Sequence, residues 1–436
     1  MCGDIGRRRP VEEVRDPIFA KVLVLEASGC KLVLVQLDLT IVTRRWTNRL
    51  REAIGGKLGI DPKAVMVFAT QNHAAPGLGD CFVFNDFSYM PDELAWLRGG
   101  DDRYNPIVVE RATEAAVRAN DQLQPVSIGA ASGIESRVAF NRRFVMRDGT
   151  AATHPANSDP RIRYAEGPID PEVGIVCLKD AHGETVAALL HYTCHPNHGY
   201  PHRFVTADWP GAWANGVREL LGESCVPLVL NGCCGNIHHH NHLDRDHVDS
   251  YERMGRLLTE TTEGILRHLE FQACDSIAWF TNAIALPWSR QDEEGLRQAR
   301  DLLPRYPEPM WLDEARSAVD WEWVYAVALL DLQITMNRDS AYSYEIQVFR
   351  IGDIAIVGLP GEPFVEGQLR IKLNSPTYPT YAVHMTNDCA SYIATPEAIE
   401  RGGYETRPGH ASKFAPGALD MIVDTATEIL REAFGK

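Results

Sequence analysis

The sequence predicts an α/β protein built from a layered mixed sheet with flanking helices. Short continuous apolar runs recur along the 436 residues, and amphipathic stretches of helical length separate them. Such runs are typical of strands that are buried on both faces by helices. Polar side chains that can bind metals or transfer protons follow several runs, as expected where strands fix the backbone and short loops aim a few ligands at one point.

In the first third of the chain, predicted strands alternate with predicted helices. The strands are expected at residues 21–25, 31–39, 64–70 and 126–131, and the helices at residues 47–58 and 106–119. Residues 133–169 are rich in arginine, asparagine, glycine and proline, which predicts long loops. Loops of this length are uncommon inside a compact domain unless they serve function, for example as a wall over a site.

The rest of the chain continues this alternation. Strands are expected at residues 173–178, 185–192 and 226–230, and helices at residues 211–221 and 251–269. Residues 296–336 have a mostly helical pattern interrupted by prolines, and residues 344–436 follow the order strand, turn, helix, strand and closing helix. Because no repeat or linker divides the chain, the sequence predicts one domain over residues 1–436.

The composition restricts the class of protein. The 43 basic and 59 acidic residues leave a formal charge of -16, which disfavours a nucleic-acid partner. No stretch approaches the roughly 20 apolar residues of a membrane helix, and the N-terminus lacks the apolar core of a signal peptide, so we expect a cytoplasmic protein that does not bind membranes. The ten cysteines show no CxxC spacing, which predicts buried thiols.

Five segments place ligand-type side chains beside or after predicted strands, which makes a metal hydrolase the leading interpretation. They are Gln71–Gly77, His191–His198, Asn231–His238, Gly358–Pro363 and Asn387–Tyr392.

Histidines are concentrated in two of these segments. His195 shares one loop with three further histidines, and neutral imidazole is a favoured zinc ligand whose second N–H a carboxylate such as Asp208 can hold. His238 begins a second cluster after a predicted strand and a tight turn, a position that suits an oxyanion-binding or ligand role. Successive side chains of an extended segment point to opposite sides, so at most two members of this cluster can serve one centre.

The carboxylate and tyrosine candidates each have an ordinary structural interpretation as well. Glu362 lies between a predicted buried strand and a helix that starts near Phe364, so it can bind a cation or cap that helix. Tyr392 and Tyr404 can ligate zinc or donate a proton, but a tyrosine more often packs with its hydroxyl satisfied. The residues alone leave these alternatives open.

Taken together, the segments resemble the N-terminal catalytic domain of neutral ceramidases, zinc amidases that cleave the amide bond of ceramide. The order and spacing match over nearly the whole chain at Arg15-Asp16-Pro17, Gln36-Leu37-Asp38, the turn that contains His73, Cys194-His195-Pro196 followed by Ala207-Asp208, the Asn231-Gly232 turn, Pro360-Gly361-Glu362, and the pair Tyr392 and Tyr404. The resemblance implies a divergent member without the C-terminal immunoglobulin-like domain of those enzymes.

Carried over by position, the resemblance implies that His195, Glu362 and Tyr392 are zinc ligands. It implies that Tyr404 contacts the reacting group, and it places His73 on an active-site histidine of the family. It also places Arg142 near a substrate-facing arginine.

Two positions depart from the family pattern. Gln71 stands where the family has its first histidine ligand, so we expect His73 or His238 to complete the ligand set, unless the metal is harder than zinc or absent. His238 stands where the family has a serine assigned as catalytic, which argues against a serine mechanism.

We therefore expect a hydrolase that holds one divalent ion, with zinc as the first choice, and activates water to attack an amide or ester. His73 or Tyr404 would manage the proton, and Arg142 would bind an anionic part of a small polar substrate. The alternatives are a metal-dependent lyase or isomerase that acts alpha to a carbonyl, and a non-catalytic relative that binds a small ligand. A homo-oligomer is compatible with the sequence, because Trp311 and its neighbouring tryptophans could form an interface.

Overall fold

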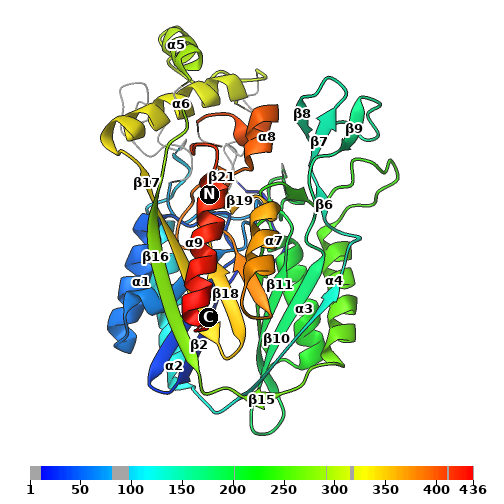
Figure 1. The fold of residues 1–436 in the computed structure, drawn as a ribbon, viewed down its shortest axis with the longest axis vertical. Helices are drawn as coiled ribbons and strands as arrows, with labels where there is room; N and C mark the ends of the chain where they lie inside the picture. The colour runs from blue at the N-terminus through cyan, green and yellow to red at the C-terminus, as the bar shows by residue number, and fades with distance from the viewer. Residues whose placement is uncertain are drawn as a thin grey trace.

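The computed structural model describes residues 11–80, 98–200, 202–290, 292–314, 319–409 and 412–435. It confirms an α/β protein with mixed sheets and flanking helices. The layers take the form of three separate sheets arranged around one apolar centre, each with its own pair of outer helices (Figure 1). Residues 1–10, which contribute to the expectation of a chain without a signal peptide, lie outside the described residues.

The N-terminal sheet has the strand order β2-β3-β4, with β3 antiparallel to β2 and parallel to β4. Its strands are β2 (Ala20–Ala27), β3 (Cys30–Leu37) and β4 (Val65–Ala69), and its elements outside the sheet are α1 (Arg44–Leu58), the turn η1 (Pro62–Ala64) and α2 (Tyr104–Asp121). Val33 and Val35 of β3 pack against the helices, whereas Leu32 and Leu34 face the centre of the molecule. The unbroken apolar run of β3 therefore reflects burial on both faces.

The second sheet has the order β13-β11-β10-β5-β15, and β11 and β13 are parallel. Its elements are β5 (Ser127–Ile134), β10 (Glu172–Lys179), β11 (Thr185–Tyr192), β13 (Val226–Asn231) and β15 (Gln272–Ala273), covered by α3 (Asp208–Leu221) and α4 (Tyr251–Leu266). Ile175 and Cys177 of β10 face the helices, and Val176 and Leu178 face the centre.

The third sheet has the order β16-β17-β18-β20, and β18 and β20 are parallel. Its elements are β16 (Ile277–Leu286), β17 (Tyr342–Ile351), β18 (Ile354–Gly358) and β20 (Thr380–Val383), with α7 (Val365–Asn374) and α9 (Ala418–Ala433) outside. β16 was not among the predicted strands, although only Thr281 and Asn282 interrupt its apolar sequence. It is an edge strand whose residues are mostly half-exposed or exposed, unlike the buried core strands that were predicted.

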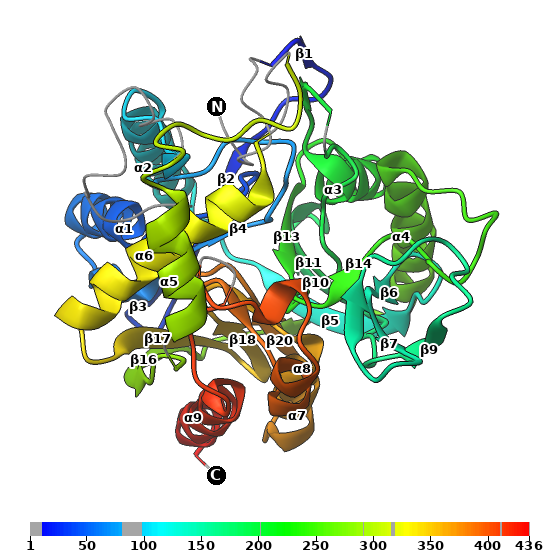
Figure 2. The same cartoon turned by 90° about the horizontal axis from the view of Figure 1, so that it is seen from above.

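Side chains from all three sheets meet in one central cluster. Viewed from above, the pairs α1 with α2, α3 with α4, and α7 with α9 stand on three sides of the molecule with the sheets between them (Figure 2). The central cluster includes Leu34, Phe68, Val176, Leu189, Phe349, Ile356 and Val383.

The upper part of the molecule contains short strands and further helices (Figure 1). They are β6 (Phe140–Asn141), β7 (Arg143–Met146), β8 (Ala151–Thr153), β9 (Ile162–Ala165), β14 (Ile237–His238), α5 (Glu293–Leu302), α6 (Trp321–Arg338), β19 (Glu362–Pro363), β21 (Tyr392–Ile393), α8 (Pro396–Arg401) and η3 (Tyr404–Thr406). The expectation of long loops over residues 133–169 was wrong in part, because β7 pairs with both β8 and β9 in a small antiparallel sheet. Near the N-terminus, β1 (Glu13–Val14) pairs with β12 (Phe204–Val205).

Each of the three sheets contributes one parallel pair, namely β3 with β4, β11 with β13, and β18 with β20. The carboxyl ends of these pairs meet, since Asn231 Nδ2 donates to the Thr70 carbonyl at 3.0 Å and the His384 amide donates to the Asn231 carbonyl at 3.1 Å. Ligands commonly bind at the carboxyl ends of parallel strands.

None of the helices in the described ranges has the length and apolar content needed to cross a lipid bilayer.

We expect the substitution Gln36→Leu to lower the free energy of unfolding by about 1–3 kcal/mol, because a buried N–H would lose its acceptor. Gln36 is fully buried in β3, and its Oε1 accepts a hydrogen bond from the Val229 amide of the neighbouring sheet. Urea denaturation followed by circular dichroism measures the change. The exposed Gln124→Leu is the matched control, with an expected effect within about 0.5 kcal/mol. Equal stability of the two variants would contradict the inferred role of this link.

Candidate functional site

His195 and His73 face one another at the meeting point of the strand ends. Their Nε2 atoms lie 3.0 Å apart, and His195 is fully buried in the loop after β11. His195 Nδ1 lies 3.3 Å from the Cys234 carbonyl, which can only accept, so this nitrogen has the proton and the lone pair lies on Nε2. Burial, Arg142 and His73 all lower the pKa of His195 well below its usual value, which keeps the ring neutral.

Glu362 and Tyr392 are direct neighbours across a two-residue parallel pairing of β19 and β21. The pairing depends on Gly361, whose φ is +72° and where a Cβ would lie 2.6 Å from the Ser391 carbonyl. Glu362 does not cap the following helix, because Phe364 is the N-cap of α7 and no side chain caps it. The helix-capping interpretation is therefore wrong, and the carboxylate points to the site instead.

The Glu362 carboxylate lies in an unusual environment. Its Oε2 atom is 3.8 Å from His195 Nε2, and it is buried without a hydrogen-bond partner among the described residues. Burial raises the pKa of this carboxyl to about 7, although the Gln71 amide, Arg142 and the Tyr392 hydroxyl act in the opposite direction. A buried, incompletely satisfied carboxylate is costly unless a cation or proton accompanies it.

Three further side chains line the centre. Cys234 Sγ lies 3.5 Å from Gln71 Oε1, 3.7 Å from His195 Nδ1 and 3.8 Å from both ring nitrogens of His384. Gln71 was predicted as a departure from the family pattern and Cys234 as one of the buried thiols, whereas His384 was not among the predicted residues. The available signal for His384 was its place directly after β20.

The backbone around the centre contains several non-glycine residues in the left-handed region, which is sparsely populated and concentrated at functional sites. They are Gln71, Asp208, Met385, Asn387 and Ser391.

Arg142 reaches the centre from the segment between β6 and β7. Its guanidinium lies 5.3 Å from the centre of the Tyr392 ring, its Nε is 2.9 Å from Glu405 Oε1, and its Nη2 donates to the Gly235 carbonyl at 2.6 Å. These contacts hold the positively charged guanidinium of Arg142 against Tyr392 and Glu405. The contact of Arg142 with an anionic substrate group stays a prediction.

The two tyrosines lie together at the edge of the site. Their ring centres are 5.6 Å apart at an angle of 70°, with Tyr392 buried and Tyr404 38% exposed. Burial and the charge of Glu362 raise the pKa of Tyr392 well above its usual value, and Arg142 opposes this shift. Tyr404 thus offers the more accessible hydroxyl of the pair.

The remaining histidine candidates have ring contacts with groups other than the His73 and His195 pair. The His238 ring packs against His154 at 4.4 Å and His239 at 3.9 Å, and burial lowers its pKa well below the usual value. His191 contacts the Ala382 carbonyl between two sheets. Of the two residues expected to replace the missing ligand, His73 is therefore the one the structure places beside His195.

The donor set is compatible with a divalent metal in part. Ligand atoms of a tetrahedral zinc ion with bonds of about 2.0–2.1 Å lie about 3.3 Å apart. The separations of 3.0 Å between the histidine nitrogens and 3.8 Å from His195 Nε2 to Glu362 Oε2 bracket this value, whereas these ligand atoms of His73 and Glu362 lie more than 4.8 Å from each other. The unpartnered carboxylate oxygen supplies a further reason to place a cation there.

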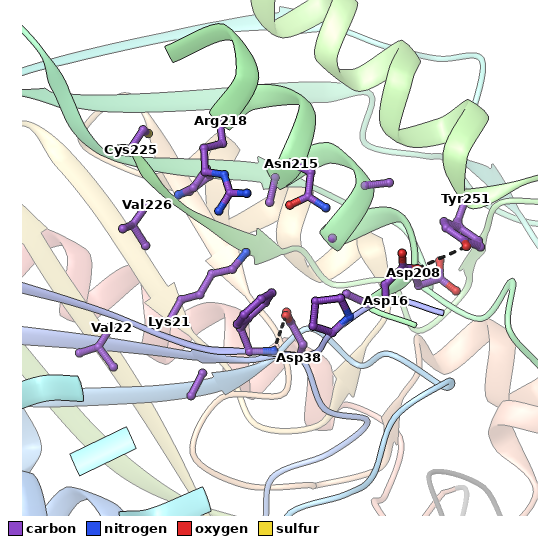
Figure 3. A pocket seen from close by; sticks show the side chains of 18 of the residues that line it. Asp16, Lys21, Val22, Asp38, Asp208, Asn215, Arg218, Cys225, Val226 and Tyr251 are labelled. Carbon is purple, nitrogen blue, oxygen red and sulfur yellow. Dashed lines mark hydrogen bonds between the residues drawn. The ribbon is translucent and has the colours of Figure 1, made fainter. Parts of the chain in front are cut away.

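A separate cavity of about 630 Å³ opens between β2 and α3 (Figure 3). Lys21 and Arg218 point into it from opposite walls, and Asp208 and Asp16 lie at one end. Asp208 is the one candidate partner residue that lines this cavity, and none of the predicted ligands or catalytic residues does.

Comparison with known proteins supports the resemblance. No protein-family model matches the chain. The neutral ceramidase of Pseudomonas aeruginosa is 28% identical over 181 residues, a match that spans 41% of this chain and only 24% of that enzyme. The crystal structure of neutral ceramidase from Pseudomonas aeruginosa aligns with a TM-score of 0.70 at 15% identity, covering 99% of this chain and 71% of the other. A structure of ceramidase complexed with C2 aligns with a TM-score of 0.71 at 16% identity, covering 99% and 72%.

We expect Glu405→Gln to lower the free energy of unfolding by about 3–5 kcal/mol, because it removes one partner from a buried ion pair. Glu405 is fully buried between Arg142 and Arg143. The exposed pair of Glu13 with Arg15 provides the control, and Glu13→Gln should cost no more than about 1 kcal/mol. Guanidinium denaturation of both variants tests this, and a small effect of Glu405→Gln would show that the pair contributes no more than a surface one.

Proposed function

We propose that this chain, which has the fold of a neutral ceramidase catalytic domain, is a metal-dependent hydrolase that cleaves an amide bond. The ion is held by His73, His195, Glu362 and Tyr392. The observation that supports this most strongly is the buried Glu362 oxygen without a partner, which faces the lone pair of His195 at 3.8 Å. The fold of neutral ceramidases, which the two solved structures share with the chain, favours hydrolysis over other metal chemistries.

A bound zinc ion would polarise the substrate carbonyl and lower the pKa of a bound water molecule to about 7, so that hydroxide is available at neutral pH. The residues of the chain prepare the site for it. The Cys234 carbonyl fixes the His195 ring with Nε2 toward the centre, and the pairing with Tyr392 fixes the Glu362 carboxylate. Outer contacts of this kind orient ligands and hold the required tautomer.

Arg142 stabilises the charged form of Tyr392. The guanidinium opposes the effect of burial on the tyrosine pKa, so the phenolate is less costly with Arg142 in place than without it. Glu405 in turn holds Arg142 in this position through the contact of 2.9 Å.

Gln71 occupies the position where the resemblance expects a histidine ligand. Its amide hydrogen-bonds to the Glu362 carboxylate and lies 3.5 Å from Cys234 Sγ. In this proposal Gln71 positions Glu362, and His73 takes the place of the missing nitrogen ligand.

Tyr404 is the group for proton transfer in this proposal, because His73 serves as a ligand. Tyr404 is more than one third exposed beside the buried Tyr392, so its hydroxyl can reach a substrate. A phenol in hydrogen-bond reach of the leaving nitrogen could supply its proton.

The substrate in this proposal is a small polar amide or the corresponding ester. The side chains around the centre are mainly polar, including His154, His238 and Arg142, and the chain has a formal charge of -16. These polar surroundings suit a substrate with a polar acyl or amine group better than one with a long acyl chain.

We expect His195→Ala and Glu362→Ala each to lose about one equivalent of metal per chain, because each removes a ligand from the same centre. Elemental analysis of the purified wild-type protein and both variants measures this. His182→Ala, a change to an exposed histidine, should keep the wild-type content. Unchanged metal in both site variants would contradict the ligand assignment.

We expect the wild-type protein to hydrolyse short N-acyl amides of polar amines faster than a short-acyl ceramide, and to lose this activity on chelation. In water labelled with heavy oxygen, hydrolysis places the label in the acid product, because water supplies the new carboxyl oxygen. Product formation without label would favour the lyase or isomerase alternative. No turnover of any amide or ester by metal-loaded protein would favour the non-catalytic alternative.

A further inference from the structure

A second group of ligand-type side chains lies beside the proposed centre and plays no part in it. His198 follows His195 in the same loop, His239 follows β14, and Asp249 directly precedes the N-cap of α4. The two imidazole rings are stacked, with their centres 3.5 Å apart and an interplanar angle of 17°. Their side chains are only 5% and 7% exposed, whereas Asp249 is 23% exposed and gives the group a side toward solvent.

The outer nitrogen of each ring already has a protein partner. His198 Nδ1 lies 2.7 Å from Asp208 Oδ1, and His239 Nε2 lies 2.7 Å from Asn197 Oδ1. Because Asp208 also accepts from the Trp209 amide at 2.7 Å, its carboxylate is anchored as an acceptor. Asp208 was expected to hold a ring N–H of a histidine in this loop, and in the structure that histidine is His198.

The inner nitrogens converge on one carboxylate. His198 Nε2 lies 3.1 Å from Asp249 Oδ1, and His239 Nδ1 lies 2.6 Å from Asp249 Oδ2. One ligand atom from each residue lies within 4.8 Å of the others. With the outer nitrogens protonated, two lone pairs and a carboxylate face one another, an arrangement that a metal ion or a proton between them stabilises.

We propose that His198, His239 and Asp249 form a second divalent-metal site of the zinc type, separate from the centre at His195 and independent of the proposed hydrolysis. Two imidazoles and a carboxylate are a donor set that zinc accepts, with water able to complete the coordination. The Asp208 carboxylate and the Asn197 amide oxygen act as the outer partners that fix the tautomer of each metal-binding histidine.

A neighbouring group, His240 and His247 with the same Asp249, suits a metal less well. His240 Nδ1 is 3.5 Å from the carboxylate and its side chain is 24% exposed, while His247 Nε2 already contacts the His239 carbonyl at 3.2 Å. Only the His198 and His239 pair combines burial with an outer partner on each ring.

The competing occupant of the site is a proton. Burial lowers the pKa of His198, but the carboxylates of Asp208 and Asp249 more than offset this and raise it to about 9. A protonated His198 between two carboxylates would hold the group together without metal, so the experiment must separate the two occupants.

The site would join two segments that also belong to the main centre. His198 lies three positions after His195, and His239 follows His238, so an ion between them ties the loop after β11 to the segment after β13. Its expected role is to hold these segments in place, and zinc alone should therefore raise the thermal stability of the metal-free protein.

Zinc content of four proteins tests the proposal: wild type, His195→Ala, Asp249→Asn and the double variant. We expect about two, one, one and no zinc ions per chain, respectively. One ion in the wild type and in Asp249→Asn, with none in His195→Ala, would overturn the second site and leave the proposed function intact. One ion in the wild type and in His195→Ala, with none in Asp249→Asn, would support the second site and contradict the main centre.

A second measurement keeps the test independent of the folding of Asp249→Asn. Zinc titrated into metal-free His195→Ala protein should bind at about one equivalent and raise its unfolding temperature. His239→Gln in the same background should abolish both effects, and exposed His202→Ala should change neither. No binding to the His195→Ala protein would show that the cluster holds a proton only.

Discussion

The carboxylate of Glu405, buried between two arginines, is the interaction on which the upper part of the molecule depends. It faces Arg142 at 2.9 Å and Arg143 at 2.7 Å, and Arg143 also pairs with Glu166. Charges buried in this way are tolerated only when each is paired and hydrogen-bonded. The ion pairs therefore bind the segment that contains β6 to β9 to the segment that contains Tyr392 and Tyr404, and they fix the approach of both segments to the site.

Below these ion pairs, the strand ends of the three sheets fix the backbone of the site residues. Each sheet ends a parallel strand pair at the same place, so residues from segments far apart in the chain meet there. His73 and His195 come from two of these ends, and Glu362 comes from the third. Tyr392 and Arg142 belong to the upper segments, so the ion pairs around Glu405 influence the environment of one proposed ligand.

Most strands and helices could be predicted from the sequence, because an apolar run between amphipathic stretches has few other interpretations. The order of the motifs also pointed to His195, Glu362 and Tyr392. Local patterns could not reveal Glu405 as the partner of Arg142, since the two lie far apart in the chain and many arginines and glutamates are available. His384 was overlooked, because its place directly after a short strand is a weak signal until the neighbouring sheet brings it beside Cys234.

The pairing of β19 with β21 has a consequence for how the chain tolerates change. Glu362 and Tyr392 are opposite each other in a ladder of only two residues, and the segment between them includes α7 and β20. If the register slipped by one position, Ser391 or Ile393 would lie opposite Glu362. Because side chains alternate between faces along a strand, Tyr392 would then point away from the site. An insertion in this segment therefore preserves the pairing only where a loop before β21 accommodates the extra residues. We expect differences in length among related chains to lie in the turns on either side of β20.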